Sequence, residues 1–137
     1  MDAKISYCNT DLVLKSADDL TPLAADFTAL GLEVLHVTHG EDGMWYSTIE
    51  ANEPWEKPEA REPERSIGEM LAAIESFDKE MRTVWSRCTL REFNIGYDCG
   101  DEPWAFNQGL SHELLSRIVA VGGAIRVTLY PHRDEAT

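Results

Sequence analysis

The stretch from Trp85 to Phe106 constrains the fold most, because it joins a strand-like alternation to the densest supply of large apolar side chains in the chain. From residue 92 onward, apolar and polar residues alternate with the period of two that is typical of a strand with one buried face. Gly100, with Asp98 and Asp101 close by, provides turn chemistry, after which the alternation resumes. The apolar positions are Phe93, Ile95, Tyr97, Trp104 and Phe106. The pattern predicts a β-hairpin over residues 89–107 whose apolar face requires cover from helices elsewhere.

An amphipathic helix predicted over residues 66–85 is the candidate for that cover. Ser66 and Glu69 have the spacing of a capping box, in which each side chain bonds a free backbone N–H at the start of a helix. Apolar residues then recur at steps of three and four, which predicts one continuous stripe. The stripe consists of Ile67, Met70, Leu71, Ile74, Phe77, Met81, Val84 and Trp85. We expect this helix to pack over the hairpin.

The remaining elements follow from similar patterns. Residues 4–15 change parity near Cys8, which favours a frayed start and a strand over 10–15 instead of one bulged strand. The predicted order continues with a helix between Ser16 and Gly31, a hairpin of strands 32–38 and 44–49, a helix begun by Ser111 and a strand at 124–130. The residues after Pro131 should fray.

This order of elements predicts a single α+β domain over residues 1–137, with a mostly antiparallel sheet and helices on one face. The layout fits a ferredoxin-like fold. A duplicated ferredoxin-like fold is the alternative, because the segments that begin at Leu23 and Leu114 share the order helix, glycine, strand. Such frames host many functions, so the fold by itself indicates none.

Two segments carry a resemblance to a known family. Cys88–Gly96, which reads CTLREFNIG, together with Ile125–Tyr130, which reads IRVTLY, resembles a family of small bacterial proteins classed as domains of unknown function. The likeness covers mainly residues 85–130. It implies an α+β fold and no known activity, and it implies a structural role for the positions that carry it.

The charge of the chain excludes some classes of partner. Twelve basic residues against twenty-five acidic ones give a net charge of −13, which repels nucleic-acid phosphates and anionic lipid surfaces. We therefore expect no nucleic acid and no membrane among the partners. The sequence shows no signal peptide and no apolar run long enough to span a bilayer. Three cysteines without Cys-x-x-Cys spacing favour free thiols and a cytoplasmic location.

Residues 50–65 form an acidic, proline-rich stretch that predicts a long surface loop. Glutamates recur at every third position, which would align their carboxylates along one edge of a locally extended segment. These glutamates are Glu50, Glu53, Glu56, Glu59 and Glu62. Trp55 is the only large apolar residue in the stretch. It either pins the loop to the core or stays exposed as an anchor for a partner.

No motif in the chain indicates a catalytic centre, a cofactor or a metal site. His36 and His39 are the only histidines near metal-ligand spacing, and on a strand this spacing places them on opposite faces. Asp98, Asp101 and Glu102 crowd one predicted turn, where neighbouring carboxylates either serve acid–base chemistry or are simply solvated. The sequence leaves enzymatic activity open and favours its absence.

The favoured interpretation is a non-enzymatic protein-binding module whose acidic face docks a basic protein, with complementary charge speeding encounter and aromatic anchors giving affinity. An immunity or inhibitor protein that neutralises a basic enzyme is one form of this role. The candidate binding residues are Trp55, Glu53, Glu56, Glu59, Asp101, Glu102 and Trp104. The alternative is a small-ligand-binding protein or enzyme with a pocket between helix and sheet near Tyr97 and Trp104. A homodimer formed on an open sheet edge is the third option.

Overall fold

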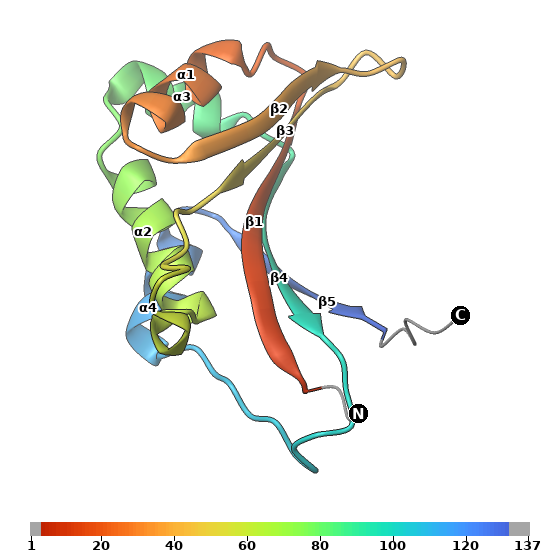
Figure 1. Ribbon diagram of the computed structural model, residues 1–137. Helices are drawn as coiled ribbons and strands as arrows, with labels where there is room; N and C mark the ends of the chain where they lie inside the picture. The colour runs from red at the N-terminus through yellow and green to blue at the C-terminus, as the bar shows by residue number, and fades with distance from the viewer. Residues whose placement is uncertain (1–3, 132–137) are drawn as a thin grey trace.

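The computed structural model describes residues 4–131 and consists of a five-stranded sheet with four α-helices on one of its faces (Figure 1). In chain order the elements are β1 (Ser6–Ser16), α1 (Thr21–Ala29), β2 (Glu33–His39), β3 (Trp45–Glu50), α2 (Pro63–Glu75), α3 (Lys79–Ser86), β4 (Leu90–Asp98), α4 (His112–Ala120) and β5 (Ala124–Tyr130). A short 3-10 helix at Pro58–Ala60 interrupts the loop between β3 and α2. The predicted α+β class is confirmed. The predicted fraying of residues 132–137 lies outside the described residues.

The strand order is β2-β3-β1-β4-β5, and neighbouring strands run antiparallel except β4 and β5, which run parallel. The order of the first four strands is compatible with a ferredoxin-like layout, and α4 with β5 adds one strand beyond it. β1 lies in the middle of the sheet. Its residues of one parity, Thr10, Leu12, Leu14 and Ser16, are buried, because successive side chains on a strand point to opposite faces and the helices cover one of them.

The two segments that share the order helix, glycine, strand lie at opposite edges of the sheet. α1 is followed by Gly31 and β2, and α4 is followed by Gly122 and β5. Both glycines have positive φ, 91° and 71°, a conformation in which glycine ends a helix without steric cost. The similarity in sequence thus reflects the same way of entering an edge strand.

β4 confirms the strand predicted in the central stretch, but the predicted hairpin is wrong. β4 pairs with β1 on one side and with β5 on the other, so residues 99–110 form a loop instead of a strand of the sheet. Phe93 and Ile95 are buried, whereas Trp104 is 99% exposed. Alternation in a sequence indicates a buried face and not which strand lies beside it. β5, whose alternation of apolar and polar residues is longer, pairs with the edge of β4 at which the second strand of the hairpin was expected.

The predicted cover helix is present as two helices, α2 and α3. α2 begins earlier than predicted, at Pro63, so Ser66 lies inside it and the predicted capping box is wrong. α2 ends at Glu75. Asp78 begins α3 by accepting a hydrogen bond from the backbone N–H of Met81 at 2.9 Å. Aspartate is a strong N-cap residue, and here it divides an otherwise continuous apolar stripe.

The start of the chain is a strand and not the frayed segment that the change of parity favoured. β1 extends back to Ser6 and pairs with β4, and its register shifts between Tyr7 and Asn9. This irregularity accommodates the change of parity at Cys8 without ending the strand. The other predicted elements are confirmed, including the hairpin of β2 and β3, the cap of α4 by Ser111 and strand β5.

The buried apolar residues form one cluster between the helices and the sheet. At its centre the ring of Phe27 from α1 packs edge to face against Phe77 and Trp85, with 5.2 Å and 6.5 Å between ring centroids. Phe93 and Ile95 of β4 belong to the same cluster. The predicted packing of the apolar helical stripe and the central strand into one core is therefore confirmed, although the hairpin is not.

Candidate functional site

Exposed large apolar side chains are concentrated in the C-terminal third of the described chain. Those outside this third are Leu30, Leu35 and Trp55. Those within it are Trp104, Phe106, Leu115, Val119, Ile125, Val127, Leu129 and Tyr130, which come from the loop 99–110, α4 and β5. Phe106, Val127 and Leu129 line one groove, and exposed apolar surface gathered at one place commonly marks an interaction site, so we take this groove as the candidate site.

β5 exposes apolar side chains because it is an edge strand that the helices do not fully cover. Residues paired across parallel strands share a face, so Ile125 and Val127 of β5 lie on the same face as their partners Phe93 and Ile95, which are buried. Leu129 follows on this face as the partner of Tyr97. The exposed fraction rises along the strand, from 39% at Ile125 to 56% at Val127 and 62% at Leu129. The cover that the helices provide therefore ends along β5.

An apolar groove lies between β5 and the loop 99–110. We define it by Ile5, Tyr97, Phe106, Val127 and Leu129, and its volume is about 440 Å³. The rings of Tyr97 and Phe106 meet edge to face at 5.8 Å between centroids, so an aromatic contact holds the loop beside β4. Partial burial raises the pKa of the Tyr97 hydroxyl. The sequence predicts a pocket between helix and sheet near Tyr97 and Trp104, whereas this groove is lined by strand and loop residues and by neither a helix nor Trp104.

Trp104 belongs to the loop that borders the groove but does not line the groove itself. Figure 1 shows this loop running from the end of β4, past the beginning of β1, to α4. With an exposed fraction of 99%, the indole makes almost no contact with its own chain. Exposure of so large an apolar surface to water is unfavourable, so a partner that buries the indole would gain binding free energy.

β5 also has a free edge. Within residues 4–131 it pairs with β4 alone, so the N–H and C=O groups along its outer side have no strand partner. A row of such groups is a template for a strand of another chain. The free edge and the groove are adjacent, because both are formed by β5.

Acidic residues adjoin two residues of the groove lining, Cys99 and Gly100, in the sequence. Asp98, Asp101 and Glu102 are exposed and form no ion pair with any residue that the structure describes. The arginines of α4 and β5 are already paired, since Arg117 binds Glu75 and Arg126 binds Glu92, each at 2.7 Å. The described chain therefore leaves these three carboxylates without an ion pair.

The acidic loop 50–65 contributes less to the surface than its sequence predicts. The side chain of Glu53 is only 4% exposed, and its Oε1 accepts hydrogen bonds from the Ser66 hydroxyl at 2.8 Å and the Tyr7 hydroxyl at 3.2 Å. Arg61 lies beside the other carboxylate oxygen, 3.9 Å away. Desolvation in this cluster raises the pKa of Tyr7. Glu53 therefore holds the loop against β1 and α2 and does not face a partner.

Trp55 combines the two roles that its sequence context left open. Its ring stacks on the guanidinium of Arg61, 4.0 Å from the ring centroid, and yet it remains 66% exposed. Glu56 and Glu59 are exposed. No hydrogen bond or ion pair among the described residues joins this group to Asp101, Glu102 and Trp104, so the predicted site residues form two separate groups.

Sequence analysis did not identify Val127 and Leu129 as site residues. The alternation of apolar and polar residues correctly predicts that both side chains lie on the face of the sheet that carries the helices. Whether they are buried there depends on whether a helix covers that end of β5. A signal was present in the lengths of the elements. The nine residues of α4 span about 14 Å, whereas the seven residues of β5 span about 23 Å. A helix this short cannot cover the whole strand that follows it.

Two carboxylates oppose each other on the open face of the sheet. Asp11 of β1 and Glu50 of β3 are register partners, and the amide of Asn9 donates a hydrogen bond to each, both at 3.1 Å. Burial first, and then the charge of Glu50, raise the pKa of Asp11 to about 6. Like charges placed directly across a sheet destabilise it.

Asp11→Asn should raise the free energy of unfolding at pH 7.5 by about 1 kcal/mol, a value discounted because the group is half exposed. The pKa of Asp11 is higher in the folded protein than its ordinary value of 3.8, so the native protein gains stability as the pH falls from about 7 to 5. The variant should lack this gain. Urea unfolding at about pH 7 and about pH 5 measures this gain in the native protein and in the variant. Replacement of an exposed carboxylate, Asp101→Asn, is the control. An unchanged pH dependence in Asp11→Asn would contradict the assignment.

His36 and His39 each contact neighbouring side chains. The ring nitrogens of His36 lie 2.9 Å and 3.0 Å from the hydroxyls of Thr38 and Thr48, and His39 stacks on Trp45. No group of three or more His, Cys, Asp or Glu side chains within residues 4–131 is placed to hold a metal ion. None of the helices in this range has the length and apolar character needed to cross a membrane.

Comparison with known proteins assigns no family. No protein-family model matches the chain, and neither a curated protein nor a solved structure matches it. The resemblance of Cys88–Gly96 and Ile125–Tyr130 to a bacterial family therefore stays a prediction. In the structure these segments belong mainly to β4 and β5, which are neighbours in the sheet.

Proposed function

We propose that the protein is a non-enzymatic binding module that docks a basic protein at the apolar groove between β5 and the loop 99–110. The observation that carries the proposal is that exposed Phe106, Val127 and Leu129 line one groove, bordered by the loop that carries the exposed Trp104, in a chain of net charge −13. An apolar centre with a charged rim is the usual anatomy of a specific interface. Trp104 is the anchor, because an exposed tryptophan that a partner buries commonly dominates affinity.

Charge favours a basic partner over a second copy of this chain. Lysine or arginine side chains at the rim of a partner would neutralise Asp98, Asp101 and Glu102, which have no ion pair in the described chain. Two copies would instead bring equal sets of carboxylates together, each on a molecule with a charge of −13. Neutralisation of a basic enzyme by an immunity or inhibitor protein is a specific form of this role.

A small apolar ligand is the second candidate for the same groove. The volume of about 440 Å³ falls within the range of small-molecule pockets, and Tyr97 supplies a hydroxyl. Trp104 lies outside the lining, so a small ligand does not need it. Sensitivity of binding to replacement of Trp104 therefore separates the two roles.

Site-specific cross-linking followed by binding kinetics tests the proposal. A photoreactive residue at position 104 should capture a basic protein from a lysate of the source organism, whereas the same residue at exposed Leu30 should not. The association rate constant of the purified partner should then fall at least about tenfold between low and physiological salt, because opposite charges steer the encounter. The proposal would be contradicted if the residue cross-linked a second copy of the chain or an acidic protein, or if the association rate constant did not change with salt concentration.

A further inference from the structure

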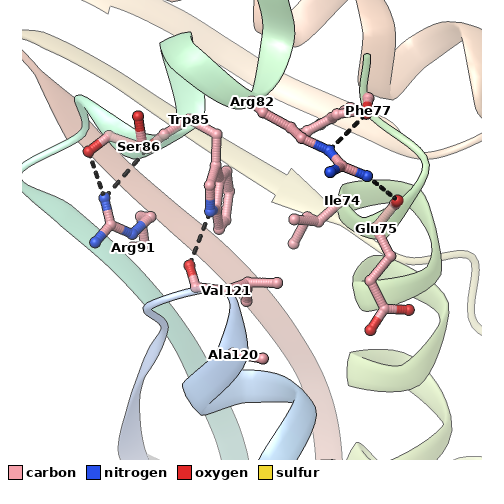
Figure 2. Close-up of a pocket in the computed structure, with 9 residues that line it drawn as sticks. All are labelled: Ile74, Glu75, Phe77, Arg82, Trp85, Ser86, Arg91, Ala120 and Val121. Atoms are coloured by element: carbon pink, nitrogen blue, oxygen red, sulfur yellow. Dashed lines mark hydrogen bonds between the residues drawn. The ribbon is translucent and has the colours of Figure 1, made fainter. Parts of the chain in front are cut away.

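A second cavity lies between the ends of α2, α3 and α4, away from the groove. Its volume is about 420 Å³. Figure 2 shows the indole of Trp85 at its centre, with apolar walls formed by Ile74 and Val121. The indole N–H donates a hydrogen bond to the backbone carbonyl of Val121 at 2.9 Å, which fixes the ring. The cavity therefore offers a rigid aromatic floor.

Two arginines flank this floor, and they differ from the other arginines that the structure describes. Five of those are within 4 Å of a carboxylate, namely Arg61, Arg65, Arg87, Arg117 and Arg126. Arg82 and Arg91 are not, although acidic residues outnumber basic ones two to one in the chain. Both line the cavity. The two arginines that lack a carboxylate partner in the described chain are thus brought to one place.

Backbone carbonyls hold both guanidinium groups in position. Arg82 donates from Nε to the carbonyl of Phe77 at 2.8 Å and from Nη2 to that of Glu75 at 3.2 Å. Arg91 donates from Nε to Gly122, and from Nη1 to Trp85, Ser86 and Cys88. These bonds cap helix ends, and capping explains why the arginines lie here. Capping uses only part of each group, because Nη1 of Arg82 and Nη2 of Arg91 form no hydrogen bond within the described residues.

Glu75 is the one acidic residue among the cavity lining, and its charge is engaged elsewhere. Its carboxylate forms two hydrogen bonds with Arg117, at 2.9 Å and 2.7 Å. In Figure 2 the carboxylate points away from Arg82, and only the backbone carbonyl of Glu75 faces that guanidinium. No carboxylate of the cavity lining therefore pairs with Arg82 or Arg91.

We propose that this cavity binds a small organic anion, an apolar body bearing one carboxylate or phosphate group. The anionic group would accept hydrogen bonds from Nη1 of Arg82, since guanidinium N–H groups match carboxylate and phosphate oxygens. The apolar body would lie on Trp85 between Ile74 and Val121. Arg91, with its guanidinium carbon 6.0 Å from the centroid of the Trp85 ring, adds positive potential. This site is independent of the groove at β5.

Titration by nuclear magnetic resonance tests the proposal, with benzoate, phenyl phosphate and neutral benzyl alcohol as probes. The indole N–H of Trp85 and the Nε–H of Arg82 are the reporters. Benzoate or phenyl phosphate should shift both signals saturably below about 10 mM, and benzyl alcohol at the same concentration should not. The two anions distinguish a carboxylate site from a phosphate site. A lack of saturation by both anions, or equal shifts with benzyl alcohol, would overturn the proposal.

Arg82→Gln should weaken binding of the anion at least tenfold, whereas Arg82→Lys should retain most of the affinity because it keeps the charge. Arg87→Gln is the matched control, because Arg87 follows the same helix and pairs with Asp18 outside the cavity. It should leave the affinity unchanged. If Arg82→Gln binds the anion as tightly as the native protein, Arg82 only caps α2 and the proposal is wrong.

Discussion

Replacement of Phe27 by alanine is expected to lower the free energy of unfolding by about 3–5 kcal/mol. Phe27 is fully buried, and its ring packs between those of Phe77 and Trp85. The loss combines the transfer free energy of the ring with the cost of the cavity left between α1 and α3. Domains of this size are stable by about 5–15 kcal/mol in total, so the variant should lie close to unfolding. Urea denaturation followed by circular dichroism measures the change.

Trp104→Ala is the control for this prediction. It removes a larger aromatic side chain from a position that is 99% exposed, so stability should change by less than about 0.5 kcal/mol. Comparable destabilisation by the two substitutions would place Trp104 in the core, as the hairpin predicted from the sequence requires. That result would contradict the structure of the loop 99–110.

The sequence predicts elements that depend on local chemistry and fails where distant segments compete. Ser111 caps α4 as predicted, because its hydroxyl accepts a hydrogen bond from the backbone N–H of Leu114 in the same turn. The hairpin at 89–107 fails, because the choice between residues 103–107 and β5 as the neighbour of β4 depends on long-range pairing. Asp78 is a residue type that favours the start of a helix, but the apolar stripe continues on both sides of it, so the sequence predicts one helix where the structure has two.

The candidate site shows the same division. Asp101, Glu102 and Trp104 are exposed as a binding role requires, but Trp104 was also expected on the covered face of a hairpin. The glutamate periodicity of the loop 50–65 could not reveal that Ser66 and Tyr7 bond Glu53 in the interior. The groove depends on which part of β5 the helices leave uncovered, and no local pattern encodes that.

Trp104→Ala is also the substitution with the largest expected effect on function. Burial of an exposed indole at the centre of an interface contributes at least about 2 kcal/mol, which corresponds to a loss of about 30-fold in affinity. The effect should appear mainly in the dissociation rate, because the charges that steer association are unchanged. Trp55→Ala is the matched control, since Trp55 is an exposed tryptophan in an acidic loop, 50–65, that contributes no residue to the groove, whereas the loop of Trp104 does.

The most direct test of the groove as the docking site is therefore the dissociation constant of the cross-linked partner, measured for the native protein and both tryptophan variants. We expect Trp104→Ala to raise the constant by about 30-fold or more and Trp55→Ala to change it by less than about threefold. The reverse order, or equal effects of the two substitutions, would show that the partner does not bind at the groove beside β5.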